Sequence, residues 1–205
     1  MAILPIYTYD ARVLREKTRE VPRPDAEISQ LILDMFETMR LARGIGLAAN
    51  QVGKEHSIFV IDVREALDDD EEEKTPAGSD APSAPPAVSS PLVFINPVIK
   101  EYYGDDVSFE EGCLSVPNVR EEIFRPEKLH IRYRDVNFVE QELDADGILA
   151  RVIQHEFDHL EGVFFTDYLR GLKKRLVQPA LKKIKRGEME ADYRLARVRE
   201  MDVLE

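Results

Sequence analysis

The residues best suited to chemistry in this sequence are His155, Glu156 and His159, which form an H-E-x-x-H pattern. On a helix, side chains four residues apart share one face, so the two imidazoles can bind one metal ion. The glutamate between them can act as a general base on a water molecule at that ion. The alternative is a buried helix with two hydrogen-bonded histidines, which the intervening glutamate disfavours. The pattern therefore predicts a catalytic metal centre.

The flanking residues predict that this pattern lies on a helix. Apolar residues recur at helical spacing from Ile148 to Leu160, and Gly162 suits the position just past the helix end. Cap and turn residues at its start are Asp144, Asp146 and Gly147. Ile148 and Val152 continue the stripe of the histidines, whereas a neighbouring stripe is expected to face the core: Leu149, Ile153, Phe157 and Leu160. We therefore expect the metal at the floor of an apolar pocket.

The only cysteine, Cys113, is a candidate for a further ligand. A thiolate binds metals well, and two histidines with one cysteine leave a fourth position open, as in catalytic sites. A buried structural cysteine is the alternative. His56 and His130 are expected to be ordinary histidines and not ligands.

Length and charge restrict the class of protein. A chain of 205 residues is expected to form one domain with a real core. The net charge of −12 disfavours a general nucleic-acid-binding surface. A single cysteine excludes an intrachain disulfide, and no signal peptide or membrane span is evident, so we expect a soluble cytoplasmic protein.

The chain before the metal pattern divides into recognisable elements. One helical turn is expected within 10–16, and an amphipathic helix from Ile28 to about Ala42, capped by Asp25. A glycine-rich turn follows at 44–53, and then a buried strand at 57–63. Further strands are predicted at 92–95 and 98–103, with a break at Asn96 and Pro97, then at 107–109, 119–124, 129–133 and 138–143.

Two segments have unusual composition. Residues 65–90 contain six consecutive acidic residues and then a stretch rich in Pro, Ala and Ser, which predicts a disordered surface insertion. An acidic docking arm is the alternative. A last helix begins near Leu172 and carries seven basic and no acidic residues between Lys173 and Arg186; Pro179 should kink it or start a new helix. This basic stretch is either a solvated face or a docking site for an anionic partner such as RNA.

Three blocks together resemble the three motifs of bacterial peptide deformylases: G-I-G-L-A-A-N-Q at 44–51, E-G-C-L-S at 111–115, and the H-E-x-x-H block at 154–162. Their order also matches. The likeness covers nearly the whole chain apart from the insertion and the extreme C-terminus. The cysteine in the second block and the basic last helix resemble the Gram-negative-like subgroup.

The resemblance implies an α+β fold in which antiparallel strands wrap around a central, buried H-E-x-x-H helix, with a helix at the C-terminus. A single catalytic domain would span 1–170, and the basic helix and tail 171–205. The implied reaction removes the formyl group from the N-terminal formylmethionine of new polypeptides. Formylmethionyl nascent chains would be the partners, together with the ribosome through the basic helix; membrane and specific DNA binding are not expected.

The resemblance also implies roles for individual residues. Cys113, His155 and His159 would bind one divalent metal ion, Fe(II) in the cell, with Zn, Ni or Co as substitutes. Glu156 would be the general base, and the oxyanion donors would be the side chain of Gln51 and the backbone N–H of Leu114.

Val152 and Ile148 would be walls of the methionine pocket, with Ile45 near its rim, while Glu111 and Arg120 would line or brace it. The backbone at Gly46 would pair with an extended peptide. An ion pair of Asp158 with Arg125 would hold the metal helix in place.

Two other classes remain open from the residues alone. A metallo-endopeptidase of the longer H-E-x-x-H type would need a third histidine where this chain has Phe165. A metal-stabilised interaction module would need a fourth protein ligand, and only three convincing ones are present.

Overall fold

A computed structural model describes residues 1–64 and 91–196 of the chain, so the expected insertion at 65–90 lies outside the described residues. One antiparallel sheet has the strand order β1-β2-β3-β4-β5. Its strands are β1 (Gly46–Ala48), β2 (Ile58–Ile61), β3 (Leu92–Cys113), β4 (Val116–Arg134) and β5 (Glu140–Asp146). The helices are α1 (Ala26–Leu41), α3 (Gly147–Leu160) and α4 (Gly171–Lys185), with short 3-10 turns at 12–14, 49–52 and 165–167.

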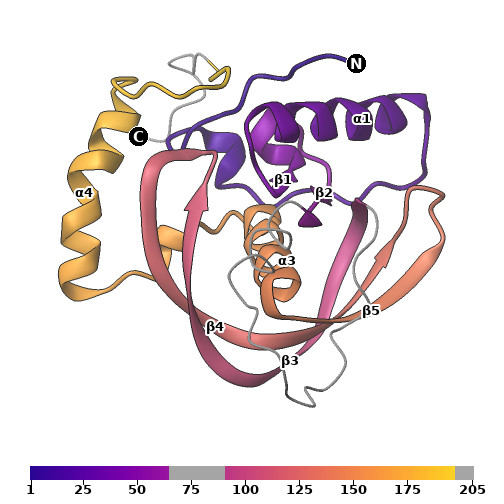
Figure 1. Ribbon diagram of the computed structural model, residues 1–205. Coiled ribbons are helices and arrows are strands. Elements are labelled where there is room, and N and C mark those ends of the chain that lie inside the picture. Colours follow the sequence, from indigo (N-terminus) through magenta and orange to yellow (C-terminus); the bar gives the residue numbers. More distant parts are fainter. Residues whose placement is uncertain (65–90, 197–205) are drawn as a thin grey trace, which may run out of the picture.

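The long strands of the sheet curve around α3, which lies at the centre of the molecule (Figure 1). The helix contacts β1, β2, β4 and β5. Its inward side packs with the apolar side chains of the sheet in one core cluster that includes Phe59, Phe94, Leu129 and Ile153. The predicted α+β fold, with antiparallel strands around a buried metal-binding helix, is confirmed.

The prediction of separate short strands between 92 and 133 was wrong. β3 runs without interruption through Asn96, Pro97 and Gly104, and β4 joins the two strands expected at 119–124 and 129–133. Irregularities in the β3–β4 pairing fall between Ile95 and Val98 and between Tyr103 and Asp106. Asn96 and Gly104 have positive φ angles there. Such bulges bend a strand without ending it, so the turn residues mark curvature and not strand ends.

Helix α3 starts and ends at residues with distinct backbone conformations. Asp146 is its N-cap residue, as predicted, but makes no side-chain cap hydrogen bond, and Asp144 lies within β5. At the other end Gly162 has φ +75°, and a Cβ there would lie 2.6 Å from the Arg15 carbonyl oxygen. A glycine is therefore required where the chain leaves the helix.

The first helix, α1, packs against β1 and β2. Asp25 accepts a hydrogen bond from the Ile28 N–H at 2.8 Å, as predicted for its cap. Ile32, Met35 and Met39 are buried in a core cluster with side chains of β1 and β2. This packing places the turn between α1 and β1 beside α3.

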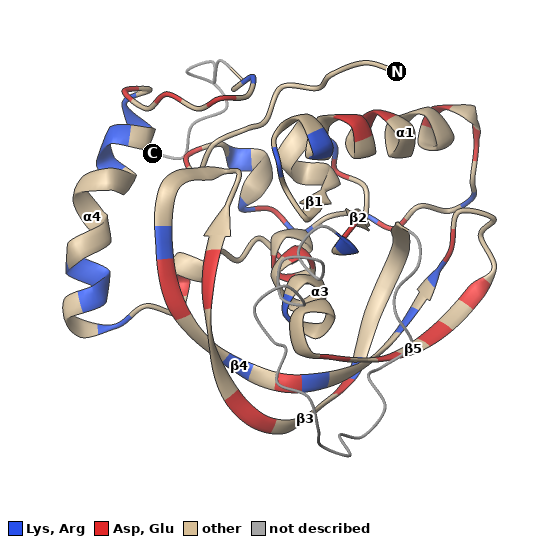
Figure 2. Cartoon of the chain, in the orientation of Figure 1, with Lys and Arg blue, Asp and Glu red and all other residues tan. Residues whose placement is uncertain are grey.

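The last helix is part of the packed structure and carries its charge on the outside. Val177, Leu181 and Ile184 are buried in a third core cluster. The helix continues through Pro179, so of the two alternatives, a kink or a new helix, the new helix was wrong. Apolar contacts on both sides of the proline offset the missing backbone hydrogen bond. Basic residues occur at both ends of α4 (Figure 2). Within the described residues no helix is long and apolar enough to span a membrane.

Candidate active site

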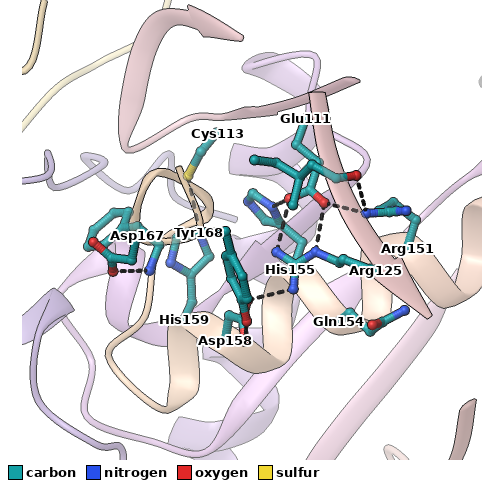
Figure 3. Close-up of polar contacts among 12 residues, drawn as sticks. Glu111, Cys113, Arg125, Arg151, Gln154, His155, Asp158, His159, Asp167 and Tyr168 are labelled. Atoms are coloured by element: carbon teal, nitrogen blue, oxygen red, sulfur yellow. Dashed lines mark hydrogen bonds and ion pairs between the residues drawn. The ribbon is translucent and has the colours of Figure 1, made fainter. Parts of the chain in front are cut away.

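The sulfur of Cys113 and the imidazoles of His155 and His159 converge although they come from distant parts of the chain. Candidate ligand atoms of the three residues lie within 4.8 Å of one another. The Cys113 Sγ is 3.1 Å from the His159 Nε2 (Figure 3). The two histidines come from successive turns of α3, and the cysteine ends β3. This donor set suits zinc or a similar first-row divalent ion and leaves a coordination position open.

A buried network of charges fixes the first of these histidines. His155 Nδ1 lies 2.9 Å from Glu111 Oε2, which leaves its other nitrogen for a metal. Glu111 also binds Arg125 through two hydrogen bonds of 2.7 and 3.0 Å and Arg151 through one of 2.9 Å. Burial opposes ionisation of Glu111, but the hydrogen bonds from His155 and Arg125 outweigh it and hold its pKa well below the usual value. A carboxylate that orients a ligand histidine is a common feature of metal sites.

Arg125 also connects α3 to the sheet. Arg125 donates to Asp158 Oδ2 at 2.6 Å, so the predicted ion pair is confirmed. Tyr168 donates to the other oxygen of Asp158 at 3.2 Å and packs its ring on the guanidinium. Because Asp158 precedes His159, this contact restrains the helix next to the second histidine.

Glu156 is buried beside the three ligands. Its side chain is 4% exposed, and its Oε2 has no hydrogen-bond partner within the described part of the chain. Burial raises the pKa of Glu156 to about 7, although the nearby His155 lowers it. Such a carboxylate can take up and release a proton near neutral pH.

Gln51 is oriented so that its side-chain amide faces the sulfur of Cys113. Its Oε1 accepts from the Ala48 N–H at 2.8 Å, which orients the amide nitrogen toward Cys113 Sγ at 3.5 Å and Ser115 Oγ at 3.2 Å. The neighbouring Asn50 donates to the His159 carbonyl and ties the first motif to α3. The amide is therefore a buried and positioned donor.

A cavity of about 1010 Å³ opens above this cluster. All predicted substrate and catalytic residues line it: Ile45, Gly46, Gln51, Glu111, Leu114, Arg120, Ile148, Val152 and Glu156. Cys113 and His155 reach it too, whereas His159 is 1% exposed and is not among its lining residues. Arg120 is mostly exposed and 3.6 Å from Glu110, so it belongs to the rim and does not brace the ligands.

The predicted non-ligand histidines lie elsewhere. His130 faces Asp144 at 2.8 Å on the sheet surface, and His56 forms an isolated bridge with Arg19. Sequence reasoning missed Arg151 and Tyr193, which also line the cavity. Arg151 lies one helical turn before His155, and this spacing was a usable signal for it. Nothing in the sequence pattern singled out the second.

Residues 3–175 match the family model of polypeptide deformylase. The chain belongs to the peptide deformylase family. The peptide deformylase of Salinibacter ruber is 49% identical over 193 residues, which is 94% of each chain. That of Cytophaga hutchinsonii is 42% identical over 94% of this chain and 96% of its own.

Solved deformylase structures agree with the fold. The enzyme from Ehrlichia chaffeensis superimposes with a TM-score of 0.75 at 36% identity, covering 92% of this chain and 98% of that one. A second structure of that enzyme, in complex with actinonin, superimposes with a TM-score of 0.74 and covers 93% of this chain and 100% of that one. The deformylase described here is thus a metal-dependent hydrolase that removes the N-formyl group from nascent polypeptides. The endopeptidase and interaction-module interpretations are not supported.

Proposed function

We propose that Cys113, His155 and His159 bind Fe(II) in the cell and accept Zn, Ni or Co in purified protein. The mixed sulfur and nitrogen donors suit all of these ions, and Glu111 orients one imidazole for binding. When bound, such an ion polarises a carbonyl oxygen and makes water a stronger acid. Metal analysis of protein purified without oxygen would identify the ion; a site filled with Zn under these conditions would contradict the assignment of iron.

In this proposal Glu156 moves the proton. It accepts a proton from the water that attacks the formyl carbon, and then donates it to the departing amine nitrogen. Formate and a free N-terminal methionine are the products. The support is the burial of Glu156 beside the ligand cluster, with one carboxylate oxygen that makes no hydrogen bond in the described chain.

The amide of Gln51 and the backbone N–H of Leu114 would donate hydrogen bonds to the oxyanion that forms on the formyl oxygen. Gln51 is oriented toward the cluster by Ala48, and Leu114 follows the cysteine directly. Loss of one such donor typically costs about 2.7–4 kcal/mol of transition-state stabilisation.

The methionine side chain would enter the cavity between Ile45, Ile148 and Val152. The peptide backbone would pair with β1, which contains Gly46 and is an edge strand of the sheet order. Arg120, at the rim, would contact the substrate beyond methionine. Gly46 of the edge strand β1 and the apolar side chains of Ile45, Ile148 and Val152 line the same cavity.

The observation that carries this function is the convergence of Cys113, His155 and His159 next to a buried Glu156. The test is release of formate from formyl-Met-Ala, run beside acetyl-Met-Ala and an unformylated peptide with an internal bond. We expect formate from the first substrate alone. Cleavage of the internal bond without formate release would refute the proposal.

We further propose that the enzyme works in the cytoplasm and meets its substrates at the ribosome through α4. The exposed cations of that helix lie on a chain of net charge −12 and would complement ribosomal RNA. Residues 1–170 would carry the ligands and the general base, and 171–205 would supply the docking surface while also packing against the core and closing the cavity wall.

A further inference from the structure

The segment that follows α4 returns to the active site. Ala191, Asp192 and Tyr193 form part of the wall of the catalytic cavity. The segment is held by backbone hydrogen bonds to Ile6: the Ile6 N–H donates to the Arg194 carbonyl at 2.9 Å, and the Ala196 N–H donates to the Ile6 carbonyl at 2.8 Å. A tyrosine within so well-anchored a segment has a defined position.

The hydroxyl of Tyr193 contacts the second motif directly. It donates a hydrogen bond to the Leu114 carbonyl oxygen at 2.7 Å, and its ring packs partly buried against the first core cluster. Burial raises the pKa of Tyr193 well above the usual value, so the hydroxyl remains a donor.

The peptide group that receives this hydrogen bond also faces the ligand sulfur. The carbonyl of Leu114 and the N–H of Ser115 belong to one planar peptide group. On its other side, the Ser115 N–H donates to Cys113 Sγ at 3.4 Å. One rigid unit thus connects the tyrosine hydroxyl with the thiolate.

We propose that Tyr193 is a positioning residue that sets the electron donation of the Cys113 sulfur through the peptide group between Leu114 and Ser115. A hydrogen bond to the carbonyl polarises the amide and strengthens the bond that its N–H donates, because linked hydrogen bonds reinforce one another. Hydrogen bonds to a ligand sulfur reduce its donation to a metal and so tune the metal's properties. The hydroxyl also restrains the turn that carries the Leu114 N–H.

This inference rests on the proposed role of Cys113 as a ligand, and one experiment separates the two. The full-length protein is loaded with Co(II), and the sulfur-to-cobalt charge-transfer absorption is recorded for wild type, Tyr193→Phe and Tyr103→Phe. Tyr103 is the matched control, because its hydroxyl donates to Asp144 at 3.3 Å and it does not line the cavity.

We expect the band to move to longer wavelength in Tyr193→Phe and to stay in place in Tyr103→Phe. We also expect kcat for formate release to fall about two- to ten-fold, the equivalent of one hydrogen bond, with KM unchanged. Absence of the band in wild type would refute the ligand role of Cys113. A band present in wild type but unmoved in Tyr193→Phe would overturn the inference alone.

A second measurement does not depend on cobalt or on activity. In the zinc-loaded protein, the NMR signal of the Ser115 amide reports the strength of its hydrogen bond. We expect it to shift upfield in Tyr193→Phe because the bond weakens. An unshifted Ser115 amide, or an equal shift in Tyr103→Phe, would show that the hydroxyl only holds the C-terminal segment.

Discussion

The backbone of Gly46 lies directly against the side chain of Glu156. A Cβ atom at Gly46 would be 2.8 Å from the Cγ and Cδ atoms of the glutamate, closer than such atoms approach in proteins. A glycine in the first motif therefore lets β1 pass close to the Glu156 side chain.

Replacement of Gly46 by alanine should accordingly displace Glu156. We expect kcat for formate release to fall by at least about ten-fold, since a carboxylate displaced by even 1 Å loses its alignment with the attacking water. Metal content should stay at the wild-type level, because the ligands are on other residues. The control for kcat is Gly171→Ala, which lies outside the cavity and has nothing within 4 Å of the added atom; its φ of +55° makes this change costly for stability, so only kcat is compared. Normal kcat in Gly46→Ala would contradict the contact.

Glu156→Gln should keep the fold and the metal but lose the proton transfer. We expect kcat to fall about 100- to 10,000-fold, as is typical when a general base is removed. Steady-state assay of formate release and metal analysis on the same sample check this. Glu122→Gln, an exposed change on β4, is the control for the loss of a carboxylate. A fully active Glu156→Gln variant with bound metal would remove Glu156 from the mechanism.

Arg125→Met should destabilise the protein strongly. The change leaves Glu111 and Asp158 without their shared cation, and breaking a buried ion pair in this way typically costs about 3–5 kcal/mol of unfolding free energy. Arg12→Met is the control: its partner Glu16 is exposed, so its loss should cost at most about 1 kcal/mol. Denaturant unfolding of both variants measures the difference. Equal effects would show that the buried network does not stabilise the fold.

Charge reversal on α4 is a sharper test of ribosome binding than removal of the helix. Deletion would also expose the core around Val177, Leu181 and Ile184. Lys174→Glu, Lys182→Glu and Lys183→Glu together change exposed side chains only. We expect the triple variant to bind ribosomes at least about ten-fold more weakly at moderate salt. Formate release from formyl-Met-Ala should be unchanged. Undiminished co-sedimentation with ribosomes would refute docking through this helix.

Replacement of residues 65–90 by a short turn should leave the enzyme active. Ile61 of β2 and Leu92 of β3 are directly paired, so the two ends that flank the segment lie on neighbouring strands. A hairpin turn can join strands so placed. We expect kcat/KM for formyl-Met-Ala within about two-fold of wild type, and a similar melting temperature, because the candidate ligands and the cavity lining that the structure describes all come from other parts of the chain. A loss of activity would assign a role to the insertion.

The strength of the sequence evidence varied with the distance over which residues interact. The helical spacing around His155, the cap at Asp25 and the glycine at 162 are local features, and each specifies its conformation within a few residues. The strand breaks expected at Asn96 and Gly104 were wrong because a turn-forming residue also suits a bulge, and only pairing with β4 decides between them.

From the sequence alone the two metal-binding histidines, the glutamate proposed as general base and the motif cysteine could be singled out, because their residue types and the motifs that contain them already limit the chemistry. Only the tertiary structure showed how they are held. Arg151 and Glu111 meet across 40 positions and Tyr193 reaches Leu114 across 79, and no local pattern records such contacts. They depend on the curvature of β3 and β4 around α3, a property that results from the packing of the whole chain.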